Sequence, residues 1–261
     1  MNSVNKTLYI PLYGKAVVSK KGIILSDKKA EEIWGAEGFS LKGKAASKWL
    51  AYYMGMRAAV FDRWAEEKLT EDPKAVVIHL GCGMDSRAVR VKTADHKWYD
   101  VDFPEVIDER RRYFEETENY QMIPGDVRTE EWIRDISETC SAIILMEGIS
   151  MYLTPEEMSA LMNTLGEHFK RAAVLMDCYT VLAAKMSKYK NPINEVGVTQ
   201  VYGMDDPKQL ENAQIAFVKE HEMTPDDLIG ELHGMEKRIF KKLYAGNFSK
   251  KLYRMYEYKT K

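Results

Sequence analysis

The chain has 261 residues, of which 45% are hydrophobic, so it can bury one large core together with a smaller helical cap. Its 40 acidic residues nearly balance its 38 basic residues and leave a net charge of −2. This balance argues against broad electrostatic attraction to nucleic acid or to an anionic membrane, and we expect neither as a partner.

Three cysteines, Cys82, Cys140 and Cys178, are too widely spaced for a paired metal site, and their odd number is typical of a reducing compartment. No apolar run approaches the ~20 residues of a membrane span, and residues 1–16 lack the apolar core of a signal peptide. We therefore expect a cytoplasmic protein with no metal site. The sequence indicates no particular oligomeric state.

Residues 1–74 are expected to be helical. Ser26 and Asp27 can cap one helix, whose apolar face includes Ile33. A longer helix is expected over residues 45–69, where apolar side chains recur at helical spacing. We expect these helices to cover the carboxyl edge of the sheet that follows.

A short apolar run, residues 76–80, predicts a buried parallel strand that ends in the glycine turn Gly81-Cys82-Gly83. Glycine lets a backbone approach a ligand closely because it has no Cβ atom. A dinucleotide fingerprint would carry a third glycine at position 86, where this chain has Ser86. The turn therefore disfavours a pyrophosphate, and with it a nicotinamide oxidoreductase.

The next expected strand ends in two aspartates. Asp100 lies 19 positions after Gly81 and Asp102 lies 21 after it, a spacing at which a doubly wound sheet holds the ribose of a nucleoside cofactor. Asp102 is the better ribose candidate because it lies nearer the carboxyl end of the strand. Asp100 would then support it from behind or neutralise Arg57 or Arg87, although the reverse assignment of the two aspartates is also open.

Two further acidic residues end expected strands. Asp126 follows the strand 121–123, where its carboxylate can accept from an adenine amino group while the N–H of Val127 donates to the ring. The alternative is a tight turn in which Asp126 caps a helix starting near Thr129. Glu147 ends an apolar fourth strand, and because burying an unpaired carboxylate is costly, it should face the cleft.

The second half of the chain continues the alternation of expected strands and helices and then interrupts it. Residues 154–157 form a capping box with proline at the first helical position, and a fifth strand follows over 172–176. Residues 183–206 are interpreted as a solvated polar segment and loop, inserted on the substrate side. An antiparallel pair of strands is expected over 215–220 and 252–258.

Strands that alternate with helices imply a parallel sheet wound by right-handed crossovers. The predicted fold class is therefore α/β, with a Rossmann-like seven-stranded sheet that is mostly parallel, has an antiparallel last strand, and carries an N-terminal helical cap. The cap would comprise residues 1–74 and the core residues 75–261, with the insertion at about 183–206.

Three ordered motifs carry a family resemblance. They are Leu80-Gly81-Cys82-Gly83-Met84-Asp85-Ser86-Arg87, Tyr99-Asp100-Val101-Asp102-Phe103-Pro104, and Met146-Glu147-Gly148 followed by Met151-Tyr152-Leu153-Thr154-Pro155-Glu156. Together they resemble the leucine carboxyl methyltransferase family, in its branch of tetracenomycin-type polyketide O-methyltransferases. The resemblance implies a methyltransferase core that binds S-adenosylmethionine.

The resemblance also implies roles for individual residues. It matches Arg57 to an arginine that grips the cofactor's carboxylate, and Lys15 to a basic residue that assists it. The alternatives are a surface arginine paired with Asp62 or Glu66 and an exposed lysine. The implied cofactor site comprises Lys15, Arg57, Gly81, Gly83, Asp102, Asp126, Val127 and Glu147. Glu147 would accept from the cofactor's ammonium group, with general base as the less favoured role.

The sequence gives weaker signals for the substrate pocket than for the cofactor site. Tyr152 and Tyr202 are candidates for the substrate pocket, and packing is the alternative for Tyr152. Lysines of the insertion would suit an acidic substrate, although a lysine-rich surface explains them as well.

The chemistry follows from the implied cofactor. A sulfonium already activates its methyl group, so the protein has to align an incoming oxygen and exclude water. A carboxylate is ionised at neutral pH and needs no base, whereas a phenol would benefit from one. None of the five histidines follows a strand end where a base is expected, so the sequence favours a carboxylate.

The predicted function is thus O-methylation of a small, polyketide-like acid. Two alternatives stay open: methylation of a protein's C-terminal carboxylate, and a non-catalytic protein that binds S-adenosylmethionine.

Overall fold

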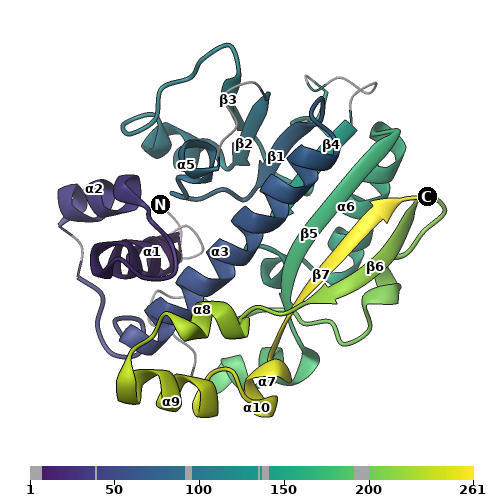
Figure 1. The fold of residues 1–261 in the computed structure, drawn as a ribbon. Helices are drawn as coiled ribbons and strands as arrows, with labels where there is room; N and C mark the ends of the chain where they lie inside the picture. Colours follow the sequence, from purple (N-terminus) through teal and green to yellow (C-terminus); the bar gives the residue numbers. More distant parts are fainter. Residues whose placement is uncertain (1–7, 39, 92–95, 135, 137–140, 191–199) are drawn as a thin grey trace.

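The structure is a computed structural model, and it describes residues 8–38, 40–91, 96–134, 136, 141–190 and 200–261. A single sheet runs through the middle of the molecule, with helices on both of its faces (Figure 1).

The described residues form seven strands, as the sequence predicts. They are β1 (Val76–Leu80), β2 (Trp98–Asp102), β3 (Tyr120–Pro124), β4 (Ser141–Met146), β5 (Arg171–Tyr179), β6 (Ile215–His221) and β7 (Tyr253–Thr260). Their order across the sheet is β3-β2-β1-β4-β5-β7-β6. Neighbouring strands are parallel from β3 to β5, whereas β7 is antiparallel to both β5 and β6. The predicted fold class is therefore confirmed.

The helices cover the two faces and the carboxyl edge of this sheet. They are α1 (Tyr9–Lys21), α2 (Lys28–Glu37), α3 (Lys48–Glu71), α4 (Arg87–Arg90), α5 (Pro104–Arg110), α6 (Pro155–His168), α7 (Val181–Lys190), α8 (Asp226–Gly230), α9 (Gly234–Leu243) and α10 (Asn247–Lys250), with short 3₁₀ turns at η2 (Ser150–Tyr152) and η4 (Pro207–Leu210). Among the residues described, no helix is both long enough and apolar enough to cross a membrane.

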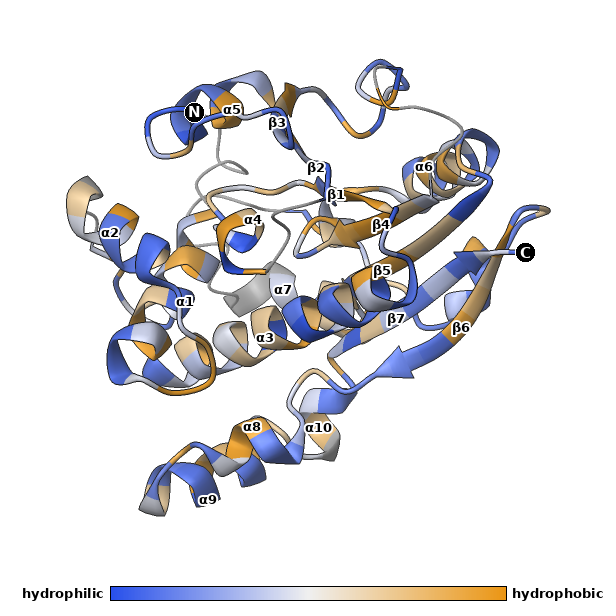
Figure 2. Ribbon diagram, turned by 45° about the horizontal axis from the view of Figure 1, so that its top comes forward, coloured by the Kyte–Doolittle hydropathy of each residue, from blue (hydrophilic) through white to orange (hydrophobic). Residues whose placement is uncertain are grey.

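Alternating side chains of each strand pack against the two helical layers, because successive residues of a strand point to opposite faces. Val77 of β1 packs in the cluster that contains Phe61 of α3, whereas the next residue, Ile78, packs with Leu161 of α6. Figure 2 shows the central strand β4 apolar along most of its length and the edge strand β6 turning hydrophilic toward its end. The central strands are thus buried on both faces.

The helix starts agree with the capping signals in the sequence. Asp27 accepts a hydrogen bond from the N–H of Ala30 at 2.9 Å and caps α2. Ser47 caps α3, so that this helix begins at Lys48 and not near residue 45. The capping box of α6 is present in full, with Thr154 as its cap.

The expected insertion at 183–206 differs from what forms. Residues 181–190 make helix α7, and Ala183, Ala184 and Ser187 are buried on its inner face. The sequence does not predict this helix, because small side chains form its buried face and give no apolar periodicity; its other face is exposed at Lys185, as expected for a solvated segment. The rest of the insertion, residues 191–199, lies outside the described residues.

Candidate active site

A cavity of about 970 Å³ lies where the loops after β1, β2, β3 and β4 meet the N-terminal helices. All of the residues that the sequence singles out for the cofactor line it: Lys15, Arg57, Gly81, Gly83, Asp102, Asp126, Val127 and Glu147. The volume is near the upper end of the ~300–1,000 Å³ that small-molecule sites occupy. The geometry thus brings eight residues, spread over more than half of the chain, to one wall.

The glycine turn after β1 passes close to the loop after β4. Gly81 has a φ of +64°, and a Cβ atom there would lie 2.0 Å from the Cγ2 atom of Ile149. Gly83 has a φ of +52°, also in the left-handed region. Glycine is required at Gly81 both for its backbone conformation and for this close contact.

Asp102 lies at the end of β2 and faces this turn. Its Oδ2 atom accepts from the N–H of Gly83 at 2.7 Å, and its Oδ1 atom accepts from the N–H of Phe103 at 2.7 Å. Burial raises the pKa of Asp102 to about 6, although the two N–H groups act in the opposite direction. Each carboxylate oxygen retains a lone pair, so the group can still accept from a ligand's hydroxyls.

Asp100 is not part of the cavity wall. It is buried and pairs with Arg110 of α5, which also donates to the carbonyl of Gly83 at 2.7 Å. The expectation that Asp100 neutralises Arg57 or Arg87 was therefore wrong, because a closer arginine on the neighbouring helix reaches it. The pair anchors the glycine turn from behind.

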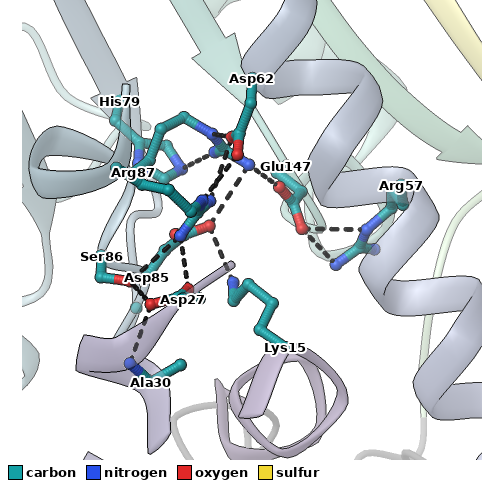
Figure 3. Close-up of polar contacts among 12 residues, drawn as sticks. Lys15, Asp27, Ala30, Arg57, Asp62, His79, Asp85, Ser86, Arg87 and Glu147 are labelled. Atoms are coloured by element: carbon teal, nitrogen blue, oxygen red, sulfur yellow. Dashed lines mark hydrogen bonds and ion pairs between the residues drawn. The ribbon is translucent and has the colours of Figure 1, made fainter. Parts of the chain in front are cut away.

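Lys15 is buried on the inner side of α1. Its Nζ atom lies 2.8 Å from the Oδ2 atom of Asp85, which is buried too (Figure 3). The alternative of an exposed lysine is therefore wrong. Arg90 approaches the other oxygen of Asp85 at 3.1 Å, and Arg87 lies 3.3 Å from Oδ2. Burial would raise the pKa of Asp85, but Arg87, Lys15 and Arg90 hold it well below its usual range.

Arg57 is also buried, on the face of α3 that looks toward the sheet. Its Nη2 atom lies 2.9 Å from Oε1 of Glu147, and its Nη1 atom lies 3.0 Å from Oδ2 of Asp177. The same Nη1 donates to the hydroxyl of Tyr253 at 2.9 Å. The alternative of a surface arginine paired within its own helix is wrong.

Glu147 sits between two guanidinium groups. Arg57 approaches it from α3, and Arg87, which is fully buried, bonds its other oxygen (Figure 3). Burial alone would raise the pKa of this carboxyl, but the two arginines lower it to about 2. Glu147 is therefore ionised at neutral pH. A carboxylate with so low a pKa is a poor general base and a good acceptor for an ammonium group.

Asp126 and Val127 are half-buried after β3. Asp126 accepts from the N–H of Arg128 at 3.0 Å and pairs with that residue's guanidinium. The tight turn of the alternative is present, because the N–H of Thr129 donates to the carbonyl of Asp126 at 2.9 Å. The helix that it would cap is not, since residues 127–134 form turns and bends.

The two tyrosines proposed for the substrate pocket line different cavities. Tyr152 lines the main cavity. Tyr202 instead lines a hollow of about 60 Å³ next to Ser150 and Met158, and its N–H donates to the carbonyl of Met151 at 2.8 Å. Tyr202 therefore does not belong to the main cavity, because the loop that carries it packs behind η2.

Another part of the cavity wall is aromatic and apolar. Four further tyrosines line it, namely Tyr53, Tyr179, Tyr244 and Tyr253. Lys44 lies at the exposed rim and makes no ion pair with any described residue. The cavity thus combines a charged half with an apolar half that has one available cation at its edge.

Sequence reasoning missed several residues that shape the charged half. Arg87, Asp177 and Tyr253 contact predicted residues directly, and Asp62 pairs with Arg87 behind them. One of them carried a usable signal, since Asp177 ends an apolar strand in the same way as Glu147 does. Arg87 lies at the end of the first motif, but nothing there pairs it with Glu147, and Asp62 in a helix interior and Tyr253 in the last strand lie outside the motifs.

Comparison with known proteins gives consistent matches. Residues 5–166 match the family described as leucine carboxyl methyltransferase. The chain is 28% identical over 243 residues to the tetracenomycin polyketide synthesis O-methyltransferase TcmP of Streptomyces glaucescens, with 92% of this chain and 90% of that protein covered. It is 26% identical over 234 residues to the S-adenosyl-L-methionine-dependent methyltransferase dpfgK of Gibberella zeae, with 81% and 78% covered.

Solved structures agree in fold. The magnesium protoporphyrin IX methyltransferase of Synechocystis, with bound S-adenosylhomocysteine, superposes with a TM-score of 0.52 at 11% identity, covering 95% of this chain and all of that one. At this identity the likeness concerns the fold alone.

Proposed function

The chain belongs to the leucine carboxyl methyltransferase family and is an S-adenosylmethionine-dependent methyltransferase, and on this premise we propose that it methylates an oxygen of a small acidic molecule. The observation that carries the proposal is the single cavity described above. Its charged half holds every cofactor candidate, and its apolar half leaves room for a second, aromatic molecule.

The charges around the cavity suit the cofactor. The connected ion pairs join the cations Lys15, Arg57, Arg87 and Arg90 to the carboxylates Asp27, Asp62, Asp85, Glu147 and Asp177. Five carboxylates against four cations leave one negative charge in excess. A cofactor with one carboxylate, one ammonium and one sulfonium carries one net positive charge and would offset the excess of this network, while the separate carboxylate of Asp102 adds a further negative charge to the wall.

The proposal gives the cavity residues distinct tasks. Asp102 would accept from the ribose hydroxyls, and Asp126 with Val127 would hold the adenine edge. Glu147 would accept from the ammonium, while Arg57 and Lys15 would face the carboxylate. These assignments rest on the geometry of the wall and on the family to which the chain belongs.

The cofactor supplies an activated methyl group, and the chain's own residues position the oxygen and exclude water. A carboxylate acceptor needs no base, which is the reason that the sequence favours one. An acidic hydroxyl is the second kind of acceptor. Lys44, which forms no ion pair with a described residue, is suited to bind the negative charge of an acidic substrate in either case.

The relatives support an oxygen acceptor on a small molecule, since one is named as an O-methyltransferase of polyketide synthesis. The cavity volume of about 970 Å³ also lies in the small-molecule range. Methylation of a protein's C-terminal carboxylate would instead need space for a peptide.

Two measurements test the proposal. Calorimetric titration with S-adenosylmethionine and S-adenosylhomocysteine should show saturable binding, whereas NAD should show none. Incubation with methyl-labelled cofactor and a panel of aromatic acids should then give a methylated product by mass spectrometry. Absence of cofactor binding, or label appearing only on protein, would contradict the proposal.

A further inference from the structure

Exposed apolar side chains gather at one end of the molecule. Eight large hydrophobic side chains are exposed among the described residues, and six of them belong to helices α7, α9 and α10, which lie at the same end of the fold in Figure 1. The six are Val181, Leu182, Met186, Met235, Leu243 and Phe248. Single exposed apolar side chains are ordinary, whereas a group of them marks a surface that binds a partner.

The same helices concentrate positive charge. Residues 181–190 and 234–251 contain nine basic residues and one acidic residue, although the whole chain has a net charge of −2. Two of the cations are paired, Lys241 with Asp226 and Lys250 with Glu222. Five exposed cations form no ion pair with a described residue, namely Lys185, Lys237, Arg238, Lys242 and Lys251. These cations and the six apolar side chains together form a basic face, and the remainder of the chain is acidic.

Helix α9 turns its cations toward solvent. Its four basic side chains share one side of the helix because they recur at four-residue spacing, Lys237 with Lys241 and Arg238 with Lys242. Phe240 is fully buried on the other side, with its ring centroid 6.3 Å from that of Tyr52 on α3. The apolar side of α9 is thus packed against the protein, and its basic side is exposed.

The basic face adjoins the large cavity. Met186 of α7, Ser249 of α10 and Tyr244, which follows α9, all line that cavity. Met186 is also 46% exposed, so the cavity wall reaches the outer surface at this residue. The start of α7 is joined to the segment after α10, because the N–H of Thr180 donates to the carbonyl of Leu252 at 3.1 Å. The three helices therefore belong to one part of the molecule, beside the apolar half of the cavity.

We propose that the basic face binds the surface of an anionic membrane. The negative potential of such a surface attracts lysine and arginine side chains, and exposed apolar side chains enter the boundary between head groups and acyl chains. No helix has to cross the bilayer for this contact. The net charge of the chain disfavours an anionic membrane only because it averages the basic face with an acidic remainder. Once the face is bound, the apolar half of the cavity lies next to the membrane, into which apolar acids partition.

The kind of basic residue favours lipid over an acidic protein. Eight of the nine basic residues in 181–190 and 234–251 are lysines, and one is an arginine. Lysine is depleted in protein–protein interfaces, in which arginine is enriched. A lysine ammonium is a point charge on a flexible stem, whereas a guanidinium suits partners of fixed geometry. Lysines are therefore suited to the mobile head groups of a lipid surface.

Sedimentation with lipid vesicles tests the proposal. The full chain is mixed with phosphatidylcholine vesicles that contain ~30% phosphatidylglycerol, and with vesicles of phosphatidylcholine alone. The test variant removes three exposed cations of the basic face: Lys237→Gln, Arg238→Gln and Lys242→Gln combined. The matched control removes three exposed lysines that also form no ion pair with a described residue, near the amino ends of β1 and β5: Lys74→Gln, Lys170→Gln and Lys259→Gln combined.

The wild type and the control should sediment with the anionic vesicles and not with the neutral ones, and binding should weaken between ~0.1 M and ~0.5 M salt. Each cation near an anionic surface changes the affinity about fivefold, so the test variant should bind ~100-fold more weakly. Phe248→Ser, which removes an apolar side chain that is 60% exposed, should weaken binding ~10-fold. Every variant should keep its affinity for S-adenosylhomocysteine within about twofold, because none of the changed residues lines the cavity.

Three outcomes would overturn the proposal. They are a wild type that stays in solution with anionic vesicles, a test variant that sediments as the wild type does, and a wild type that binds polyglutamate in solution but no vesicle. The last outcome would assign the basic face to an acidic protein. Methyl transfer and cofactor binding are measured without lipid, so a failure to bind vesicles would leave the proposed function intact.

Discussion

Asp102 should make cofactor binding depend on pH. Burial raises the pKa of its carboxyl to about 6, and in the proposed role its ionised form would accept from two ribose hydroxyls. The ionised fraction is then ~0.97 at pH 7.5 and ~0.09 at pH 5. We therefore expect the affinity to fall about tenfold between these two values, which corresponds to ~1.4 kcal/mol.

Calorimetric titration with S-adenosylhomocysteine at several pH values between 5 and 7.5 measures how the affinity changes with pH. Asp102→Asn is the matched variant, because it keeps the size of the side chain and cannot titrate. It should bind more weakly at pH 7.5 and lose most of the pH dependence. A wild-type affinity that stays constant over this range, or an equal slope in the variant, would refute the assignment of Asp102 to the ribose.

The same carboxyl should affect stability without ligand. A group whose pKa is higher in the folded state than in the unfolded one binds more protons when folded, so the free energy of unfolding falls as pH rises from ~4 to ~6. A shift of about two units corresponds to at most ~3 kcal/mol, and less in practice because Asp102 is only partly buried. We expect urea denaturation at pH 4.5 and at pH 7 to show that the wild type loses stability relative to Asp102→Asn as the pH rises from 4.5 to 7.

Further changes test other parts of the molecule. Lys44→Met should raise the KM for acidic acceptors by ~10-fold with little change in cofactor affinity, because it removes one exposed cation at the rim; Lys42→Met, away from the cavity, is the control in the same assay. Arg57→Ala should abolish cofactor binding and also lower the free energy of unfolding by ~3–5 kcal/mol, since Glu147 and Asp177 would keep buried charges with fewer partners; unchanged denaturation by urea would contradict this. Thr154→Ala should lower the free energy of unfolding by ~1 kcal/mol, because the cap of α6 is lost, and should leave activity at saturating substrate unchanged; wild-type stability of this variant would contradict a stabilising role of the cap.

Most of the fold could be predicted because its signals are local. Each buried strand is a short apolar run, and the caps of α2 and α6 need only side chains within three residues of the helix start. Helix α7 could not be predicted in this way. Its buried face consists of small residues such as Ala183 and Ser187, which a neighbouring surface buries and no periodicity reveals.

The candidate site was predictable to the extent that strand ends mark it. In a parallel sheet the carboxyl ends of the strands meet at one edge, so Asp102, Asp126 and Glu147 had to lie near one another. Their partners come from tertiary packing. Tyr253 reaches Arg57 across 196 positions of sequence, and no spacing rule could have paired them.

The ion pairs that shape the cavity also cross the boundary proposed at residue 74. Lys15 of α1 pairs with Asp85 at 2.8 Å, and Asp27, the cap of α2, pairs with Arg90 at 2.5 Å. Asp62 of α3 forms ion pairs with Arg87 and Arg90. Breaking such a pair leaves a buried charge without its partner and costs ~3–5 kcal/mol. Separating the helices from the glycine turn would break several pairs together, so we expect α1, α2 and α3 to act as one wall of the site more than as a lid that opens freely. Entry of the cofactor should then depend on the loops at the rim of the cavity.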